Sequence, residues 1–395
     1  MVKAFKFARL PEILFKNGGL SELPAVIKRF GDPVLLVTGK ESFIASERGK
    51  KLLKSLKEND ISFFKVSIPG EPSPSDIDEA IETCRDMSIK LVVAIGGGSV
   101  LDAGKAVSAM LTVQESVKHY LEGVGHKEHP GTKIPFIAMP TTSGTGSEAS
   151  KNAVISEVGS SGFKKSLRHD NFVPDIAILD PELTLNCPVT ITANSGMDCF
   201  TQLTEAFLSD KASVYTDAFA REGLKAIKSS LVKAVKNGDD LEARTGMSFA
   251  AFNSGVCLAN AGLGTVHGFA SVIGGKYDIP HGLVCGTLMA PANRVNVREL
   301  RAKDPDSCAL HKYAELGRMF LDNEGQTDDY YIDGFVDYIY RLTQDLRIPD
   351  LKDYGLLEED VKGISEKAGN KNNPFDLSKE NRMEILAERV MIEGK

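Results

Sequence analysis

Apolar and polar residues alternate in two different ways along the chain. Up to about residue 188, short apolar runs rich in β-branched residues are separated by amphipathic stretches. The apolar runs predict strands at residues 34–38, 63–66, 91–95, 134–139 and 176–179. The stretches between the first four runs predict helices, for example at 42–59 and 75–87. Strands that alternate with helices in this way are typical of a doubly wound parallel sheet.

The second part of the chain has a helical pattern almost throughout. Long amphipathic runs predict helices at residues 190–208, 213–235, 241–260 and 310–346. We therefore expect an α/β N-terminal domain with a Rossmann-like parallel sheet over residues 1–187, and an all-α C-terminal domain over residues 188–395. The two are expected to join near Cys187 and Pro188, with a functional site in the cleft between them.

A glycine-rich segment contains the third predicted strand. Residues 91–105 read L-V-V-A-I-G-G-G-S-V-L-D-A-G-K, so three glycines lead from an apolar run into a helix. Missing Cβ atoms and free N–H groups at a helix N-terminus favour a bound phosphate. The segment is not a Walker A loop, because Ala106 follows Gly104 and Lys105, and it lacks the spacing of G-x-G-x-x-G. Taken alone, it is equally compatible with a tight strand-to-helix turn.

A second loop of the same kind follows the fourth predicted strand. Residues 134–148 read I-P-F-I-A-M-P-T-T-S-G-T-G-S-E, an apolar run that opens into small hydroxyl residues and glycines. Hydroxyl and backbone groups suit phosphate and ribose oxygens, although such a loop can also be a flexible surface segment. Ligands of open α/β sheets bind at the carboxyl ends of strands, so two such ends predict a dinucleotide site.

Two histidines and an aspartate suggest a metal site. The chain has 7 histidines, and His267 and His281 lie fourteen positions apart in apolar, glycine-rich segments. A buried imidazole needs a polar partner, and Asp198 lies upstream in a helical pattern. One carboxylate and two neutral imidazoles can bind a divalent metal and leave room for a substrate oxygen.

Several long segments resemble one family, the iron-containing (group III) alcohol dehydrogenases, which are related to glycerol dehydrogenase and dehydroquinate synthase. The resemblance spans nearly the whole chain and is carried by G-G-G-S-V-L-D-A-G-K, M-P-T-T-S-G-T-G-S-E, V-P-D-I-A-I-L-D-P-E-L-T, S-G-M-D-C-F-T-Q-L-T-E-A, N-A-G-L-G-T-V-H-G-F-A and I-P-H-G-L. It implies a dehydroquinate synthase-like architecture. It also implies hydride transfer between NADP or NAD and an alcohol or aldehyde, on a divalent metal held between two domains.

The resemblance also implies a set of metal ligands. Asp198, His267 and His281 match the family's carboxylate and two of its histidines, and Gln202 stands where the family pattern G-x-D-A-L-T-H has a further histidine. A glutamine oxygen is a harder, weaker ligand than imidazole, so we expect weaker metal binding. We expect Fe²⁺, with Zn²⁺ or Mn²⁺ as alternatives. Two other hypotheses stay open: a metal-independent reductase of the maleylacetate reductase type, and a silent nucleotide-binding protein.

Ser271 marks a second departure from the family, where many members have H-x-x-x-H and this chain has serine four residues after His267. A serine can pass a proton but cannot hold one near neutral pH. With His267 and Ser271 as the catalytic residues, we expect proton exchange through the ribose hydroxyl, Ser271 and water.

The resemblance carries the cofactor contacts over to a further set of residues: Gly39, Ser42, Gly97, Gly98, Ser99, Asp102, Thr141, Thr142, Ser147, Asn152, Lys164 and Leu179. NAD-preferring relatives often have an aspartate at the end of the second family strand, where this chain has Gly39. Without that carboxylate a 2′-phosphate meets less repulsion, and Lys40 and Ser42 could bind it. This favours NADP.

Composition narrows the class of protein. At 395 residues, 42% hydrophobic and 26% charged, the chain can form two substantial cores. A net charge of −7 argues against nucleic-acid and anionic-membrane partners. Six cysteines without a C-x-x-C pair, and an N-terminus without a secretory signal, favour the cytoplasm. We expect a short primary alcohol or its aldehyde as substrate, and a homodimer as the commonest symmetric assembly.

Overall fold

The computed structural model describes residues 2 and 4–391, and among these residues six strands form one parallel sheet. The strand order is β1-β8-β5-β4-β2-β3, and every neighbouring pair is parallel. The strands are β1 Glu12–Phe15, β2 Val34–Gly39, β3 Phe63–Ile68, β4 Leu91–Gly96, β5 Phe136–Pro140 and β8 Ile176–Leu179. The glycine-rich loops follow β4 and β5. These two strands are parallel neighbours, so both loops lie side by side at the carboxyl ends of the strands.

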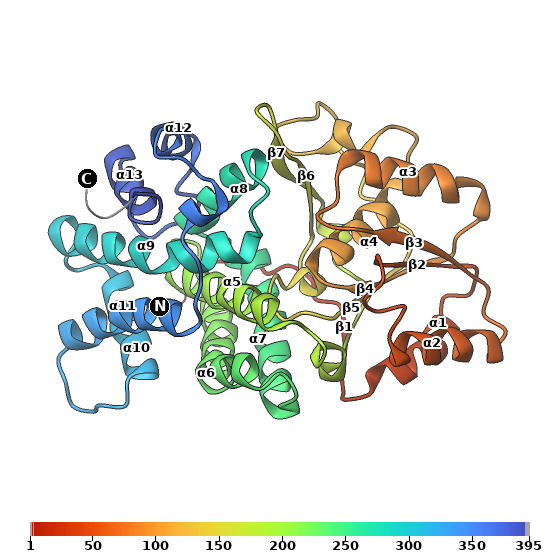
Figure 1. Ribbon diagram of the computed structural model, residues 1–395, viewed down its shortest axis with the longest axis horizontal. Coiled ribbons are helices and arrows are strands. Elements are labelled where there is room, and N and C mark those ends of the chain that lie inside the picture. Colours follow the sequence, from red (N-terminus) through yellow and green to blue (C-terminus); the bar gives the residue numbers. More distant parts are fainter. Residues whose placement is uncertain (1, 3, 392–395) are drawn as a thin grey trace.

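The sheet is covered on both faces because its central strands are apolar on both sides. Alternate residues of β4 pack into two cores: Val92 and Ala94 into one, Val93 and Ile95 into the other. The first core includes residues of α3 (Pro74–Cys84) and α4 (Gly98–Met110), and the second includes residues of α1 (Leu23–Ile27) and α2 (Glu47–Glu58). Figure 1 shows these helix pairs on opposite sides of the strands, which confirms the doubly wound prediction.

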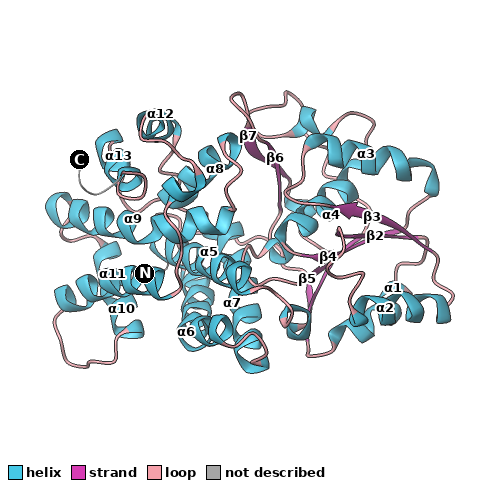
Figure 2. Cartoon of the chain, viewed as in Figure 1, coloured by secondary structure: helices cyan, strands magenta, loops and turns pink. Residues whose placement is uncertain are grey.

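The second part of the chain is helical, as predicted (Figure 2). Its helices are α5 Val189–Leu208, α6 Val214–Lys236, α7 Leu241–Ala261, α8 Thr265–Lys276, α9 His281–Lys303, α10 Cys308–Phe320, α11 Asp328–Asp345, α12 Asp360–Lys367 and α13 Lys379–Ala387. Helix α5 is buried along most of its length, so the other helices pack around it in one large core. Short 3₁₀ turns lie at Gly19–Glu22, Arg85–Met87, Val117–Tyr120, Ser147–Ala149, Asp170–Phe172, Pro181–Thr184 and Leu351–Tyr354.

Two sequence predictions of secondary structure were wrong in detail, and three strands, β1 and the two strands of a hairpin, were not predicted. The run at 310–346 is broken into α10 and α11, because Thr327 caps a new helix by accepting a hydrogen bond from Tyr330 N. Helix α2 begins at Glu47, where Ser46 caps it, and not at residue 42. An antiparallel hairpin of β6 (Asn152–Glu157) and β7 (Phe163–Arg168) was not predicted.

The loop after β5 contacts the helical part through glycine. Gly146 has φ +63°, and its carbonyl oxygen would lie 2.1 Å from a Cβ on Gly255 of α7. Ser254, next to Gly255, donates a hydrogen bond to Gly144 O over 3.2 Å. The hairpin also contacts α8, where the backbone of Phe163 lies 2.9 Å from a Cβ built on Gly275. These contacts join the sheet to the helices beside the two glycine-rich loops. The division into domains at residues 187 and 188 stays a prediction.

Among the described residues no single helix is long and apolar enough to cross a membrane. Helices α7 and α8 reach that length and apolarity only together, across a bend of 98°.

Candidate metal and nucleotide site

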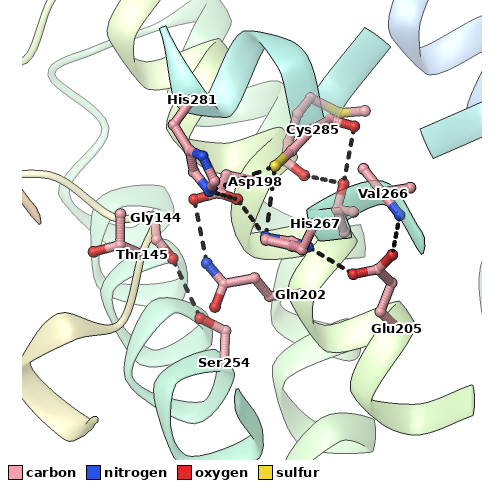
Figure 3. Close-up of polar contacts among 12 residues, drawn as sticks. Gly144, Thr145, Asp198, Gln202, Glu205, Ser254, Val266, His267, His281 and Cys285 are labelled. Carbon is pink, nitrogen blue, oxygen red and sulfur yellow. Dashed lines mark hydrogen bonds and ion pairs between the residues drawn. The ribbon is translucent and has the colours of Figure 1, made fainter. Parts of the chain in front are cut away.

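Three helices bring four potential metal ligands together (Figure 3). Asp198 lies in the middle of buried helix α5, and His267 lies in the first turn of α8. His281 is the first residue of α9, and Cys285 follows one helical turn later, which places both side chains on one face. Figure 3 shows all four side chains directed toward one point. The convergence of Asp198, His267 and His281 is the arrangement that the sequence predicted.

The four ligand atoms lie within 4.8 Å of one another. His267 Nε2 is 3.3 Å and His281 Nε2 is 3.8 Å from Asp198 Oδ1. Asp198 and His267 are only 2% and 4% exposed, whereas the His281 side chain is 25% exposed. The cluster is therefore closed on the side of α5 and open beside His281, where a substrate oxygen can reach it.

Glu205 fixes the orientation of His267. Glu205 Oε2 lies 2.6 Å from His267 Nδ1, and Oε1 accepts a hydrogen bond from Val266 N over 2.7 Å. A carboxylate at Nδ1 keeps a proton on that nitrogen, so Nε2, which faces Asp198, is the nitrogen available to a metal. Glu205 lies two helical turns after Asp198 on α5, so one helix carries both the expected ligand and the group that orients a second one.

Burial and mutual charge shift the pKa values of the cluster. Burial raises the pKa of Asp198, but the imidazoles of His281 and His267 outweigh it and lower that pKa to about 2. Burial lowers the pKa of His281 to about 4, and burial raises the pKa of the Cys285 thiol to about 12. Burial lowers the pKa of His267, but the neighbouring Cys285 and Glu205 outweigh it and raise that pKa. A divalent cation would bind the ionised carboxylate and displace a proton from His267.

The sequence placed Gln202 among the metal ligands, and the structure places it beside Asp198. Its Nε2 donates to Asp198 Oδ2 over 3.2 Å, while Oε1 is buried and has no hydrogen-bond partner within the described chain. Figure 3 shows the amide nitrogen directed toward the cluster and the amide oxygen toward Ser254.

Ser271 lies one turn after His267, and its hydroxyl donates to His267 O over 2.8 Å. Lys371 Nζ donates to the same hydroxyl over 3.3 Å. Lys371 has φ +49°, an uncommon backbone conformation for a residue with a side chain. The neighbouring residue Asn372 donates from its N–H to Leu263 O, which ties this segment to the start of α8. Lys371 was not singled out from the sequence.

The predicted phosphate site lies at the N-terminus of α4. Gly97 is the N-cap and provides no side-chain cap, so the N–H groups of the first turn can point at an anion. A Cβ on Gly98 would lie 2.6 Å from Thr145 Oγ1, and a Cβ on Gly97 would lie 3.4 Å from Thr142 Oγ1. Gly97 and Gly98 thus face the hydroxyl loop that includes Thr141 and Thr142, and Ser99 follows in the first turn of α4.

Several other residues predicted to contact the cofactor form hydrogen bonds that hold this loop in place. Ser147 Oγ donates to Asp102, and Asp102 Oδ2 also accepts from Val154 N over 3.1 Å. Lys105, 1% exposed, donates to Ser147 O, Ser147 Oγ, Ser150 Oγ and Asn152 O. This lysine was missed from the sequence, although it lies one turn after Asp102.

The remaining predicted contacts are spread over the sheet and the hairpin. Lys164 pairs with Glu71, and Leu179 is buried in β8. Gly39 ends β2, and a Cβ on it would lie 3.7 Å from Ser42 Oγ. Strands β2 and β4 are parallel neighbours, so Gly39 and Gly97 both lie at the carboxyl ends of the strands.

These residues fit a divalent metal and a dinucleotide. The cluster offers one carboxylate, two imidazoles and a thiol whose ligand atoms all lie within 4.8 Å of one another, with His281 Nε2 facing Asp198. The described α4 N-terminus lacks a capping side chain and is lined by glycines. Both features leave room for an added ligand.

Comparison with known proteins decides the family. The model of iron-containing alcohol dehydrogenase matches residues 11–181, and that of the Fe-containing alcohol dehydrogenase family, C-terminal, matches residues 192–390. The chain belongs to the iron-containing alcohol dehydrogenases. This membership confirms the predicted fold and class of enzyme. The family uses NAD(P) and a divalent metal, usually iron, as predicted.

Individual members of the family match along most of this chain. It is 29% identical to NAD-dependent methanol dehydrogenase of Bacillus methanolicus, over 91% of each chain. It is 31% identical to alcohol dehydrogenase 4 of Schizosaccharomyces pombe, over 88% of this chain and 79% of that one. The structure of an alcohol dehydrogenase from Oenococcus oeni superimposes with a TM-score of 0.87 at 30% identity, covering 98% of this chain and all of that one (100%).

Proposed function

We propose that this member of the iron-containing alcohol dehydrogenases transfers hydride between a nicotinamide cofactor and a short primary alcohol or its aldehyde, at a divalent metal held by Asp198, His267 and His281. One observation carries the proposal: these three side chains converge from three helices, and Glu205 fixes the tautomer of His267. A bound divalent ion supplies Lewis-acid polarisation of the substrate oxygen, and the nicotinamide supplies or accepts the hydride.

The protein's own residues set the position of the substrate. The partly exposed side of His281 is the open side of the cluster, so the substrate oxygen approaches there. Asp198 and His267 are almost fully buried, which keeps bulk water away from the rest of the cluster. The loops after β4 and β5 hold the pyrophosphate and ribose through the N-terminus of α4, Thr141 and Thr142.

Lys371 and Ser271 together form the proposed proton route. Reduction of an aldehyde requires one proton at the substrate oxygen, and a serine hydroxyl can only pass it on. Lys371 Nζ lies 3.3 Å from Ser271 Oγ and can hold that proton. Burial of its ammonium group lowers the pKa of Lys371, which brings it closer to neutral pH, while the residue stays exposed and can take up a proton from water.

The proposal includes a preference for NADP, a homodimer and a cytoplasmic location. Gly39 leaves the end of β2 without a carboxylate, which favours a 2′-phosphate. Ile13 and Phe15 of the edge strand β1 are exposed, and a second copy could cover them. All six cysteines are free thiols, which agrees with a reducing compartment.

The test combines metal content with turnover. Protein purified anaerobically is analysed for iron, zinc and manganese, and oxidation of NADPH and of NADH is followed on an aldehyde panel before and after chelation. We expect stoichiometric metal and turnover that is lost on chelation and restored by metal. Asp198→Asn should lose both, whereas Asp217→Asn, which disturbs an ion pair with Lys312, should keep both. Metal-free protein with undiminished turnover would contradict the proposal and favour the metal-independent type.

A further inference from the structure

Cys285 is the one member of the cluster that the family pattern does not assign. It lies one turn after His281 on α9 and is buried. Its Sγ is 3.5 Å from His267 Nε2 and 3.7 Å from His281 Nε2 (Figure 3). A buried cysteine is usually packed against apolar side chains, whereas this sulfur faces two imidazole nitrogens.

The distances match those between ligands of one tetrahedral ion. Metal–sulfur bonds of about 2.3 Å and metal–nitrogen bonds of about 2.0–2.1 Å at a tetrahedral angle place sulfur and nitrogen about 3.6 Å apart. The two sulfur–nitrogen distances in the cluster are 3.5 and 3.7 Å. For oxygen and nitrogen the same geometry gives about 3.4 Å, and His267 Nε2 and His281 Nε2 lie 3.3 and 3.8 Å from Asp198 Oδ1. The sulfur therefore lies at the distances from both imidazoles that a fourth ligand would have.

Gln202, which stands at the family's fourth ligand position, has a different contact. Its amide nitrogen donates to Asp198 Oδ2, and its amide oxygen is directed toward Ser254 (Figure 3). An amide N–H cannot bind a cation, and the hydrogen bond holds the second carboxylate oxygen of Asp198 in place. The cluster thus has a fourth donor on α9 instead of α5.

We propose that the Cys285 thiolate is the fourth metal ligand and that Gln202 positions Asp198. This inference rests on the proposed function, because it assigns a ligand to the same metal. Binding forms a metal–sulfur bond in place of the S–H bond, and the proton passes to solvent. Two anionic ligands, Asp198 and Cys285, together neutralise a divalent ion, and a soft sulfur ligand favours zinc, cadmium and cobalt over manganese.

The sulfur–metal bond can be detected directly in the cobalt-substituted protein. The full chain is stripped of metal and loaded with Co²⁺, and the near-ultraviolet absorption is recorded. We expect one Co²⁺ per chain and an intense thiolate-to-cobalt charge-transfer band. Stoichiometric Co²⁺ without that band would overturn the role of Cys285 while leaving the metal site of the proposed function intact. Failure to bind Co²⁺, Zn²⁺ or Fe²⁺ at all would overturn both.

Variants then assign the band to one sulfur. Cys285→Ser should lose the band and should weaken Cd²⁺ binding at least about 10-fold more than Mn²⁺ binding, because only the soft ion depends on sulfur. Cys257→Ser is the matched control: this buried thiol of α7 contacts Thr216 O, outside the cluster, and its variant should keep the band. Gln202→Ala should also keep the band. A band that survives in Cys285→Ser, or that vanishes in Gln202→Ala with Co²⁺ bound, would overturn the assignment.

Discussion

His267 Nδ1 lies 2.6 Å from Glu205 Oε2, and both side chains are less than 10% exposed. A buried carboxylate of this kind can be satisfied by an imidazole N–H, and here it receives a backbone N–H from Val266 as well. Glu205 thus holds the His267 side chain in place from α5, the helix that also carries Asp198. The geometry of the cluster is therefore set by one helix before any metal binds.

Glu205→Gln should weaken metal binding by about 10–100-fold, the usual cost of losing a group that orients a metal ligand. The amide is similar in size but can donate its N–H to Nδ1. His267 then carries its proton on Nε2, the nitrogen that should bind the metal. Competition with a chelator of known affinity measures the effect. Glu299→Gln, a change at an ion pair with Arg298 elsewhere in the helical part, is the control. Equal metal affinities of the two variants would contradict the orienting role of Glu205.

Gly39→Asp should shift the cofactor preference from NADPH toward NADH. A Cβ at Gly39 would make only ordinary contacts, 3.7 Å from Ser42 Oγ and 3.9 Å from Val100 Cγ2, so the side chain fits. The new carboxylate would repel a 2′-phosphate and accept a hydrogen bond from a ribose 2′-hydroxyl. The measurement is the ratio of kcat/KM for the two cofactors. Gly363→Asp in α12, where a Cβ meets open space, should leave the ratio unchanged. An unchanged ratio in Gly39→Asp would contradict a role of the residue at the end of β2 in the choice between NADP and NAD.

The sequence was sufficient for the central strands β2, β4, β5 and β8 because they are buried on both faces, a pattern that an exposed strand does not have. The edge strand β1, which reads E-I-L-F and is mostly exposed, was not predicted. The hairpin strand Phe163–Arg168 escaped notice because it reads F-K-K-S-L-R, with Lys165 and Arg168 exposed. Asp198, His267 and His281 were predicted from residue type and family pattern. Cys285 and Glu205 required the register of two helices against each other, which only packing determines.

Lys105→Met should destabilise the protein and weaken NADP(H) binding. The ammonium group donates to two backbone carbonyls, Ser147 O at 2.9 Å and Asn152 O at 2.6 Å, in a buried site. Methionine fills a similar volume but leaves these oxygens and the Asp102 carboxylate without their cation, which costs about 3–5 kcal/mol. Urea unfolding and cofactor titration measure the two effects. Lys54→Met, at an exposed pair with Glu58, should change the free energy of unfolding by less than about 1 kcal/mol. Similar losses in both variants would contradict a special role for Lys105.

Lys371→Met should change the pH dependence of aldehyde reduction. If Lys371 holds the proton, turnover falls as the pH rises through its lowered pKa, because the donor is then deprotonated. In the variant, turnover should no longer fall as the pH rises through this range. Its kcat should be about 100-fold lower at the optimum pH, while its metal content stays the same. Lys367→Met, at an exposed position on α12, should retain the wild-type profile. A fall in turnover that persists in Lys371→Met would assign the proton to another group.

Glu148 should make the protein less stable as the pH rises. Burial raises the pKa of this carboxyl from 4.5 to about 7 in the folded chain, against the opposing charge of Lys105. Below about pH 4.5 the carboxyl is protonated in both states. Between there and about pH 7 only the folded state keeps the proton, so the free energy of unfolding falls with rising pH, by up to about 3 kcal/mol. Glu148→Gln cannot ionise and should remove this slope, whereas Glu82→Gln, at an exposed position of α3, should not. Urea unfolding from pH 5 to pH 8 compares the three proteins, and equal slopes in all of them would show that Glu148 is ionised throughout, stabilised by Lys105.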